Sequence, residues 1–135
     1  MKYTDENRGA IQYPKRAKQL IDFSGLRYGN ITPTDIDGFF EVHNSLFFYY
    51  EFKYKNGNMS KGQYAALLRQ VDTDRAAGKE AVLLYCKHNV QDTSKPVKAA
   101  SCIVVKYYYN GRWWPGYGRT AKEITDMFYK HFVKG

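Results

Sequence analysis

The sequence predicts a mixed α/β fold in which a central β-sheet is flanked by helices. Runs rich in aromatic and branched apolar residues, the composition typical of strands, recur along the chain. Two later stretches carry apolar residues at spacings of three and four, which is typical of amphipathic helices. A strand–helix–strand order favours parallel pairing, whereas the Asn110-Gly111 pair is a strong signal for an antiparallel hairpin. Together these patterns predict a mixed sheet with helices on both faces.

The first predicted element is a helix over residues 14–25. Pro14 suits its first turn, where the missing N–H costs nothing, and Gly25 can end it. Residues 26–34 then form a connector with room for one short strand, because Gly29-Asn30 supplies turn chemistry within it.

The stretch from Asp37 to Lys53 predicts a β-hairpin around which the other elements are organised. His43-Asn44-Ser45 offers its only plausible turn. Residues 46–54 are apolar almost without interruption, as expected for a strand covered on both faces. Because positions 37 and 51 lie symmetrically about 44, a turn at Asn44 folds them back towards each other.

The remaining predicted elements alternate between helix and strand. The apolar stripe of the second helix includes Leu67 and Val71, and the last helix opens with a capping box from Thr120 to Glu123. In order, we expect a helix over residues 60–78, a buried strand over 81–86, a polar loop over 87–99, a hairpin of strands 101–109 and 112–114, and a helix from residue 121.

The composition predicts one intracellular domain over residues 1–135. A chain of 135 residues with 44% hydrophobic content is enough for a single core. Cys86 and Cys102 lie in strand-like runs without zinc-site spacing, which favours free buried thiols. Because no signal peptide or membrane-spanning stretch is evident, we expect a soluble cytoplasmic protein without a membrane partner. The net charge of +8 favours polyanions, of which nucleic acid is the commonest large one.

Two charged residues, Glu51 and Lys53, interrupt the apolar second strand of the hairpin. They are two positions apart, so they point to the same side. Asp37, at the start of the partner strand, is predicted to lie beside them, and buried charge is costly unless it is paired or bound to a metal. Each residue also has a structural explanation, as a turn aspartate or as an ion pair at an exposed edge. Their convergence on a strand of Leu, Phe and Tyr instead favours a site for magnesium or manganese.

This pattern resembles the PD-(D/E)XK nuclease superfamily. The matching residues are Thr34-Asp35-Ile36-Asp37-Gly38 and Glu51-Phe52-Lys53, followed by Gln63 at the start of a helix. The resemblance covers about residues 18–86 and is closest to the small phage and archaeal Holliday junction resolvases and the RecB-like nucleases. It implies a restriction-endonuclease-like αβββαβ core, which here would be followed by a C-terminal β-hairpin and helix.

The resemblance also implies a function, namely Mg²⁺- or Mn²⁺-dependent hydrolysis of DNA phosphodiester bonds, with branched or recombination/repair DNA among the expected substrates. By this resemblance Asp37 and Glu51 are metal ligands together with the Phe52 carbonyl, Lys53 lies beside the attacking water, and Gln63 orients the site. Junction resolvases of this kind are dimers, so a homodimer is a further expectation. The candidates for gripping the DNA backbone are basic residues outside this motif: Lys55, Lys61, Arg69, Lys87 and Lys106.

Several alternatives stay open at this stage. Asp35 and Asp37 can face the same side, and we choose Asp37 because it mirrors Glu51 across the turn. Gln63 equally fits a capping box with Ser60. The family's first-helix glutamate has only Glu6 or Asp22 as candidates here, which favours a rival function: a catalytically weak or inactive binding or protein-interaction module, such as a phage-encoded inhibitor. An RNA-binding sheet is a third alternative.

Overall fold

The computed structural model describes residues 19–55, 57 and 61–133, with Lys61 and Gln63 described in the backbone only. Contacts divide the chain between Pro33 and Thr34 into two compact units, and each is described by itself. The one-domain interpretation stays a prediction. The described part of the first unit contains the 3₁₀ turn η2 (Ser24–Leu26) and an isolated β-bridge between Tyr28 and Ile31.

The helix predicted over residues 14–25 is wrong in its described portion. Residues 14–18 lie outside the described residues, and from Gln19 onwards the chain forms no α-helix before η2. Leu20 and Ile21, the apolar residues of the predicted stripe, are 96% and 72% exposed. A stripe of this kind is stabilised chiefly by packing against a partner surface, and here the two side chains lie in solvent.

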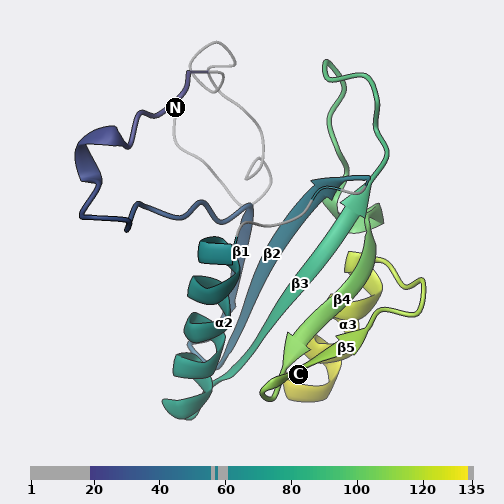
Figure 1. Ribbon diagram of the computed structural model, residues 1–135. Coiled ribbons are helices and arrows are strands. Elements are labelled where there is room, and N and C mark those ends of the chain that lie inside the picture. Colours follow the sequence, from purple (N-terminus) through teal and green to yellow (C-terminus); the bar gives the residue numbers. More distant parts are fainter. Residues whose placement is uncertain (1–18, 56, 58–60, 134–135) are drawn as a thin grey trace, which may run out of the picture. The chain divides into compact units, whose positions relative to one another are not determined.

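The second unit is a five-stranded mixed β-sheet with one helix on each face (Figure 1). The strand order is β1-β2-β3-β4-β5, in which β2 and β3 are parallel and the other neighbours are antiparallel. The α2 helix forms the crossover between the parallel strands. The bounds are β1 Gly38–Val42, β2 Leu46–Tyr54, α2 Lys61–Ala76, β3 Glu80–His88, η3 Ala99–Ser101, β4 Ile103–Tyr109, β5 Arg112–Pro115 and α3 Ala121–Phe132.

The register of the first hairpin confirms the prediction from the sequence. Val42 pairs with Leu46 and Gly38 with Tyr50, so the pairing is symmetric about Asn44. Residues 43–45 form the loop between Val42 and Leu46; within it His43 and Asn44 adopt left-handed φ angles of 50° and 56°, and the Ser45 N–H donates to the Val42 carbonyl at 2.9 Å. The register continues to the end of the hairpin, where it brings position 37 opposite position 51.

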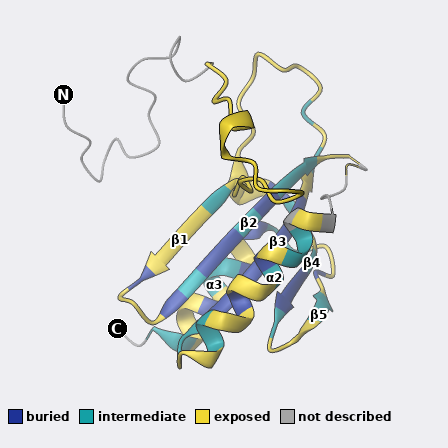
Figure 2. Cartoon of the chain, turned by 60° about the vertical axis from the view of Figure 1, so that its left-hand side comes forward, coloured by how far each residue is buried: buried dark blue, intermediate teal, exposed yellow. Residues whose placement is uncertain are grey.

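Each face of the sheet buries its own apolar cluster (Figure 2). On one face, Phe48 and its neighbours pack against Ile124 and Phe128 of α3. On the other face, Tyr49 and its neighbours pack against Leu67 and Val71 of α2. Because strand side chains alternate, odd-numbered positions of β2 share the face that α2 covers. Glu51 and Lys53 therefore lie on the α2 face.

The C-terminal elements also follow the sequence. Asn110 and Gly111 turn with φ angles of 56° and 79° between β4 and β5. The capping box of α3 is present, because Thr120 Oγ1 accepts the Glu123 N–H at 3.1 Å and Glu123 Oε1 accepts the Thr120 N–H at 2.9 Å. Among the described helices, neither length nor hydropathy would allow a passage through a lipid bilayer.

Candidate functional site

The hairpin brings two carboxylates together at one end of the sheet. The backbone N–H of Asp37 donates to Glu51 Oε1 at 3.4 Å. In return, the N–H of Phe52 donates to Asp37 Oδ2 at 2.8 Å. Asp37 precedes β1 directly and Asp35 lies two residues further back, and both side chains are exposed, so the choice between them as a metal ligand stays a prediction. The described hydrogen bonds thus connect β2 to Asp37, the residue chosen from the sequence.

Glu51 is fully buried, with 0% of its surface exposed, and is the only charged side chain in the described core. Burial and, second to it, the nearby charge of Asp37 together raise its pKa to about 7, since both disfavour the ionised form. The ammonium group of Lys53 acts in the opposite direction. The protonated form of Glu51 is therefore favoured over a wider pH range than in an exposed glutamate.

The carboxylates begin a polar row that crosses the sheet on the α2 face. Glu51 pairs with Tyr85 on β3, and Tyr85 pairs with Lys106 on β4. Lys106 Nζ lies over the rings of Trp113 (4.4 Å), Tyr64 (5.1 Å) and Tyr85 (5.8 Å). Contacts of this type hold an ammonium group without neutralising it. The row therefore runs from two carboxylates through a phenol to a caged cation.

Sequence reasoning did not identify this cage. Lys106 was only one of several candidate basic residues, and Tyr64, Tyr85 and Trp113 fit strand or helix composition equally well. Their convergence depends on the β3–β4 register, which shifts at an irregularity between Tyr85 and Cys86. Such a shift leaves no local signature in the sequence. Part of the row is more accessible: a parallel register that places Lys53 opposite Lys87 also places Glu51 opposite Tyr85.

A group of lysines lies beyond the carboxylates, where β2 and β3 end. Lys53 is directly opposite Lys87 in the parallel pair. Lys55 follows β2, and its backbone N–H donates to the His88 carbonyl at 2.8 Å. Like charges on adjacent strands repel each other, so this placement does not benefit the fold. It does suit an anionic ligand bound across the strand ends.

The other predicted site residues are placed less specifically. Gln63 and Lys61 lie in the first turn of α2, and their side chains lie outside the described residues, as does the competing cap Ser60. Arg69 is exposed in the middle of α2. Asp22, one of the two candidates for a third acidic ligand, accepts the Ser24 N–H at 2.9 Å within the first unit. Glu6, the other candidate, lies outside the described residues.

The donor set fits a magnesium-type ion bound by few protein ligands. Within residues 19–55, 57 and 61–133, no group of three or more His, Cys, Asp or Glu side chains could hold a metal ion. Mg²⁺, however, retains several waters and is commonly bound through one or two carboxylates plus substrate phosphates. Asp37 and Glu51 match that requirement, and Phe52, whose carbonyl is the predicted third ligand, follows Glu51 in β2.

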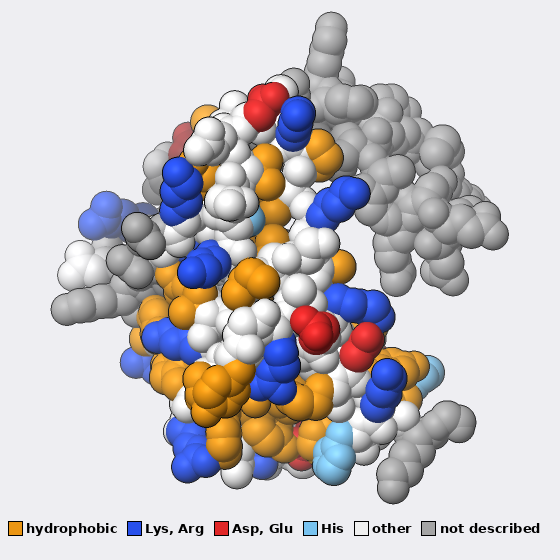
Figure 3. Space-filling model, turned by 90° about the vertical axis from the view of Figure 1, so that its right-hand side faces the viewer, with side chains coloured by type: hydrophobic (Ala, Val, Ile, Leu, Met, Phe, Trp, Pro, Cys, Tyr) orange, Lys and Arg blue, Asp and Glu red, His pale blue; other side chains and the backbone are white. Residues whose placement is uncertain are grey.

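The positive charge of the protein extends well beyond this site. Lys and Arg side chains are scattered among hydrophobic ones over the face that carries β4, β5 and α3 (Figure 3). A broad distribution of this kind attracts a polyanion as a whole rather than defining one contact.

Comparison of the chain with protein-family models, curated proteins and solved structures finds no significant match.

Proposed function

We propose that the protein is a metal-dependent nuclease that hydrolyses DNA phosphodiester bonds. The observation that carries this proposal is the placement of Asp37 opposite Glu51, with Lys53 on the same face of β2. Burying an ionised carboxylate in an apolar strand, as at Glu51, costs free energy that pairing or a bound metal ion offsets. The lysines at the adjacent strand ends favour a phosphate-bearing ligand at this place.

We further propose that β1, β2, α2 and β3 form the core that the PD-(D/E)XK resemblance implies. Support comes from the order of these elements: a hairpin carrying Asp37 and Glu51, a crossover helix, and a strand parallel to β2. The first helix and first strand of an αβββαβ core would have to come from residues before Asp37. The described part of that region offers only η2 and the Tyr28–Ile31 bridge.

The mechanism assigns a separate task to each side chain. Asp37 and Glu51, with the Phe52 carbonyl, would hold Mg²⁺ or Mn²⁺, which when bound supplies Lewis-acid stabilisation and a more acidic water. Lys53 orients the attacking water and adds positive charge near the phosphorane-like transition state. Lys55 and Lys87 hold the flanking phosphates without reading sequence. The role of Gln63 in orienting the site, which the resemblance implies, remains part of the proposal.

One observation favours a second candidate, a nucleic-acid-binding or protein-interaction module with weak or no catalysis. The described residues supply two clustered acidic ligands rather than three. If the third ligand of an active enzyme is missing, the basic strand ends can still bind phosphates. The two candidates share the same surface and differ in whether a metal ion bound at Asp37 and Glu51 leads to cleavage.

The proposed partner is DNA in the cytoplasm, and the homodimer is part of the proposal.

The two cysteines bear on the proposed compartment. Cys86 and Cys102 are both free and buried, as predicted. Burial raises the pKa of Cys86 to about 12, so its thiol stays protonated and unreactive. Free thiols of this type are compatible with a reducing compartment.

Metal binding is the first test. Mn²⁺ is titrated calorimetrically into the 135-residue protein and into its Asp37→Asn, Glu51→Gln and Asp35→Asn variants. Asp92→Asn is the matched control, since Asp92 is an exposed loop residue that accepts its hydrogen bonds from Ser94. We expect binding to be lost in the first two variants and kept in the last two. Unchanged binding by Asp37→Asn and Glu51→Gln would overturn the proposed site.

Cleavage is the second test. Forked, duplex and single-stranded DNA are incubated with Mn²⁺ and each protein, including Lys53→Met. We expect wild-type protein to cut and Asp37→Asn, Glu51→Gln and Lys53→Met to lose at least about a hundredfold in rate, as is usual when a group that stabilises the transition state is removed. Equal cutting by all proteins would indicate a contaminant. Metal binding without cutting would favour the second candidate.

A further inference from the structure

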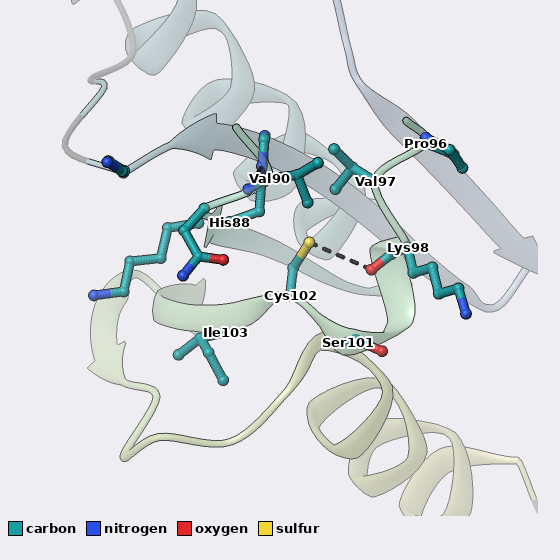
Figure 4. Close-up of a pocket in the computed structure, with 11 residues that line it drawn as sticks. His88, Val90, Pro96, Val97, Lys98, Ser101, Cys102 and Ile103 are labelled. Atoms are coloured by element: carbon teal, nitrogen blue, oxygen red, sulfur yellow. Dashed lines mark hydrogen bonds between the residues drawn. The ribbon is translucent and has the colours of Figure 1, made fainter. Parts of the chain in front are cut away.

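A cavity of about 680 Å³ opens beside the candidate site, at the end of the sheet where β3 stops and β4 begins (Figure 4). This size lies within the range of small-molecule binding pockets, roughly 300–1,000 Å³. Its walls come from the end of β3, the connection that follows it, and the start of β4. The residues on which its chemistry depends are Val90, Val97, Cys102, Ile103, Lys87 and Lys98.

The cavity has an apolar interior and a cationic border. Val90 and Val97 lie close together on one side, and the Cys102 thiol lies opposite them, donating to the Lys98 carbonyl at 3.5 Å (Figure 4). Lys55, Lys87 and Lys98 also line the cavity, and none of its lining residues is acidic. An apolar interior with ammonium groups at its border suits a ligand that has an apolar part and an anionic part, as a nucleotide has in its base and its phosphate.

The cavity and the candidate site share a border. Lys87 lines the cavity and lies directly opposite Lys53, two residues along β2 from Glu51. Lys55, which also lines the cavity, is tied to β3 through its hydrogen bond to His88. A DNA strand whose phosphate lies at Lys53 would therefore meet Lys87 and Lys55 next, and a neighbouring base would lie at the cavity entrance.

We propose that this cavity binds one unpaired nucleotide of the DNA substrate, next to the phosphate that is cut. The inference rests on the proposed nuclease function and defines its substrate: DNA with a base displaced from the helix, as in a fork, flap or single strand. In blunt duplex every base is paired and stacked, so filling the cavity would require unpairing and unstacking a base, which disfavours binding. The cavity thus selects for structure rather than for sequence.

The test compares substrates and charge-matched variants without cleavage. Fluorescence anisotropy is measured in EDTA with a fork carrying 2-aminopurine at the first unpaired position, a single strand, and a blunt duplex. Val97→Glu introduces a carboxylate into the cavity, and Val105→Glu introduces the same charge outside it. The two valines are similarly exposed, at 38% and 42%. Thermal unfolding of both variants establishes that each is folded.

We expect wild-type protein to bind the fork at least about tenfold more tightly than the duplex, and 2-aminopurine emission to change on binding. Val97→Glu should abolish this preference and the emission change, whereas Val105→Glu should weaken all three DNAs equally. Lys98→Gln removes one ammonium group from the border of the cavity. The slope of log affinity against log salt concentration for the fork should become shallower by the equivalent of about one phosphate contact. Equal affinity for fork and duplex, or a preference that persists in Val97→Glu, would overturn the inference.

The outcome is separable from that of the proposed nuclease activity. If the protein cuts DNA with Mn²⁺ and Val97→Glu has no effect on substrate choice, the nuclease proposal stands and the cavity proposal fails. If the fork is selected through Val97 while no metal-dependent cutting occurs, the chain binds unpaired DNA but the nuclease proposal fails.

Discussion

Asp37 and Glu51 exchange contacts across the hairpin, since the Asp37 N–H donates to the Glu51 carboxylate and the Asp37 carboxylate accepts the N–H that follows Glu51. Two acidic side chains are thereby held together, one exposed and one fully buried. Carboxylates so close repel when both are ionised, and the raised pKa of Glu51 reflects this as well as its burial. At the proposed metal site, a cation would therefore compete with the proton of Glu51.

The stability of the protein should therefore depend on pH through Glu51. Its folded-state pKa of about 7 exceeds the ordinary value of 4.5, so the folded state retains a proton that the unfolded state loses. Stability falls as pH rises from 4.5 to 7 and stays low above that. Glutamine does not ionise, so Glu51→Gln removes this pH-dependent loss of stability. The unfolding free energy of the metal-free protein should rise by roughly 2–3 kcal/mol at pH 8 but change little at pH 4.5. Urea denaturation at both pH values measures the difference.

A matched control for that experiment is Glu41→Gln. Glu41 lies in the same hairpin but is exposed, and its carboxylate accepts the Asn44 N–H at 2.9 Å, which a glutamine oxygen can also do. We expect a change below about 0.5 kcal/mol at both pH values. If Glu51→Gln behaved in the same way as Glu41→Gln, Glu51 would not be the buried, proton-retaining carboxyl group described above.

Metal affinity should rise with pH over the same range. Below pH 7 a cation must displace the proton of Glu51. The apparent Mn²⁺ affinity of the wild-type protein should thus increase up to about tenfold per pH unit between pH 5 and 7 and level off above it. Calorimetry in two buffers of different ionisation enthalpy gives the number of protons released. A pH-independent affinity would show that the cation does not bind at Glu51.

Lys106 should contribute to DNA affinity through the aromatic cage. Its ammonium group lies over three rings and no salt bridge to it is found in the described residues, so its charge is available to a phosphate. Lys106→Met keeps the approximate length of the side chain but removes its charge. The slope of log DNA affinity against log salt concentration should become shallower by the equivalent of about one phosphate contact. Lys130→Met, at an exposed position of α3, is the control with the same loss of charge. Equal effects would exclude a specific contact at Lys106.

The turn of the first hairpin should tolerate glycine and reject branched residues at Asn44. Its φ of 56° is left-handed, which asparagine and glycine adopt readily and valine does not. Asn44→Val should cost about 1–2 kcal/mol, and Asn44→Gly should be close to neutral. Urea denaturation of both variants measures the cost. A neutral Asn44→Val would mean that the turn does not hold the register.

Much of the second unit followed from local sequence patterns. The hairpin register is set by a short turn and strict alternation, so Asp37 and Glu51 could be placed opposite each other from their positions alone. The capping box at Thr120 and the Asn110-Gly111 turn are equally local. In each case a few adjacent residues determine the geometry, and tertiary contacts only reinforce it.

The rest depends on contacts between distant segments. The helix predicted over residues 14–25 failed in its described portion, because spacing alone supplies no surface for Leu20 and Ile21 to pack against. The aromatic cage required the irregular β3–β4 register, and the cavity required the path of the loop after His88. Neither can be deduced from a single strand.

The fluorescence of Trp113 can report on the state of the aromatic cage. Trp113 lies 4.4 Å from the Lys106 ammonium group, whereas Trp114, the other tryptophan of the chain, lies under Arg112 at 3.7 Å and donates to the Tyr109 carbonyl. A phosphate that draws Lys106 away would alter the electric field at the Trp113 indole. Unlabelled protein, with Trp114 replaced by phenylalanine, could thus signal occupancy of the sheet through its own emission.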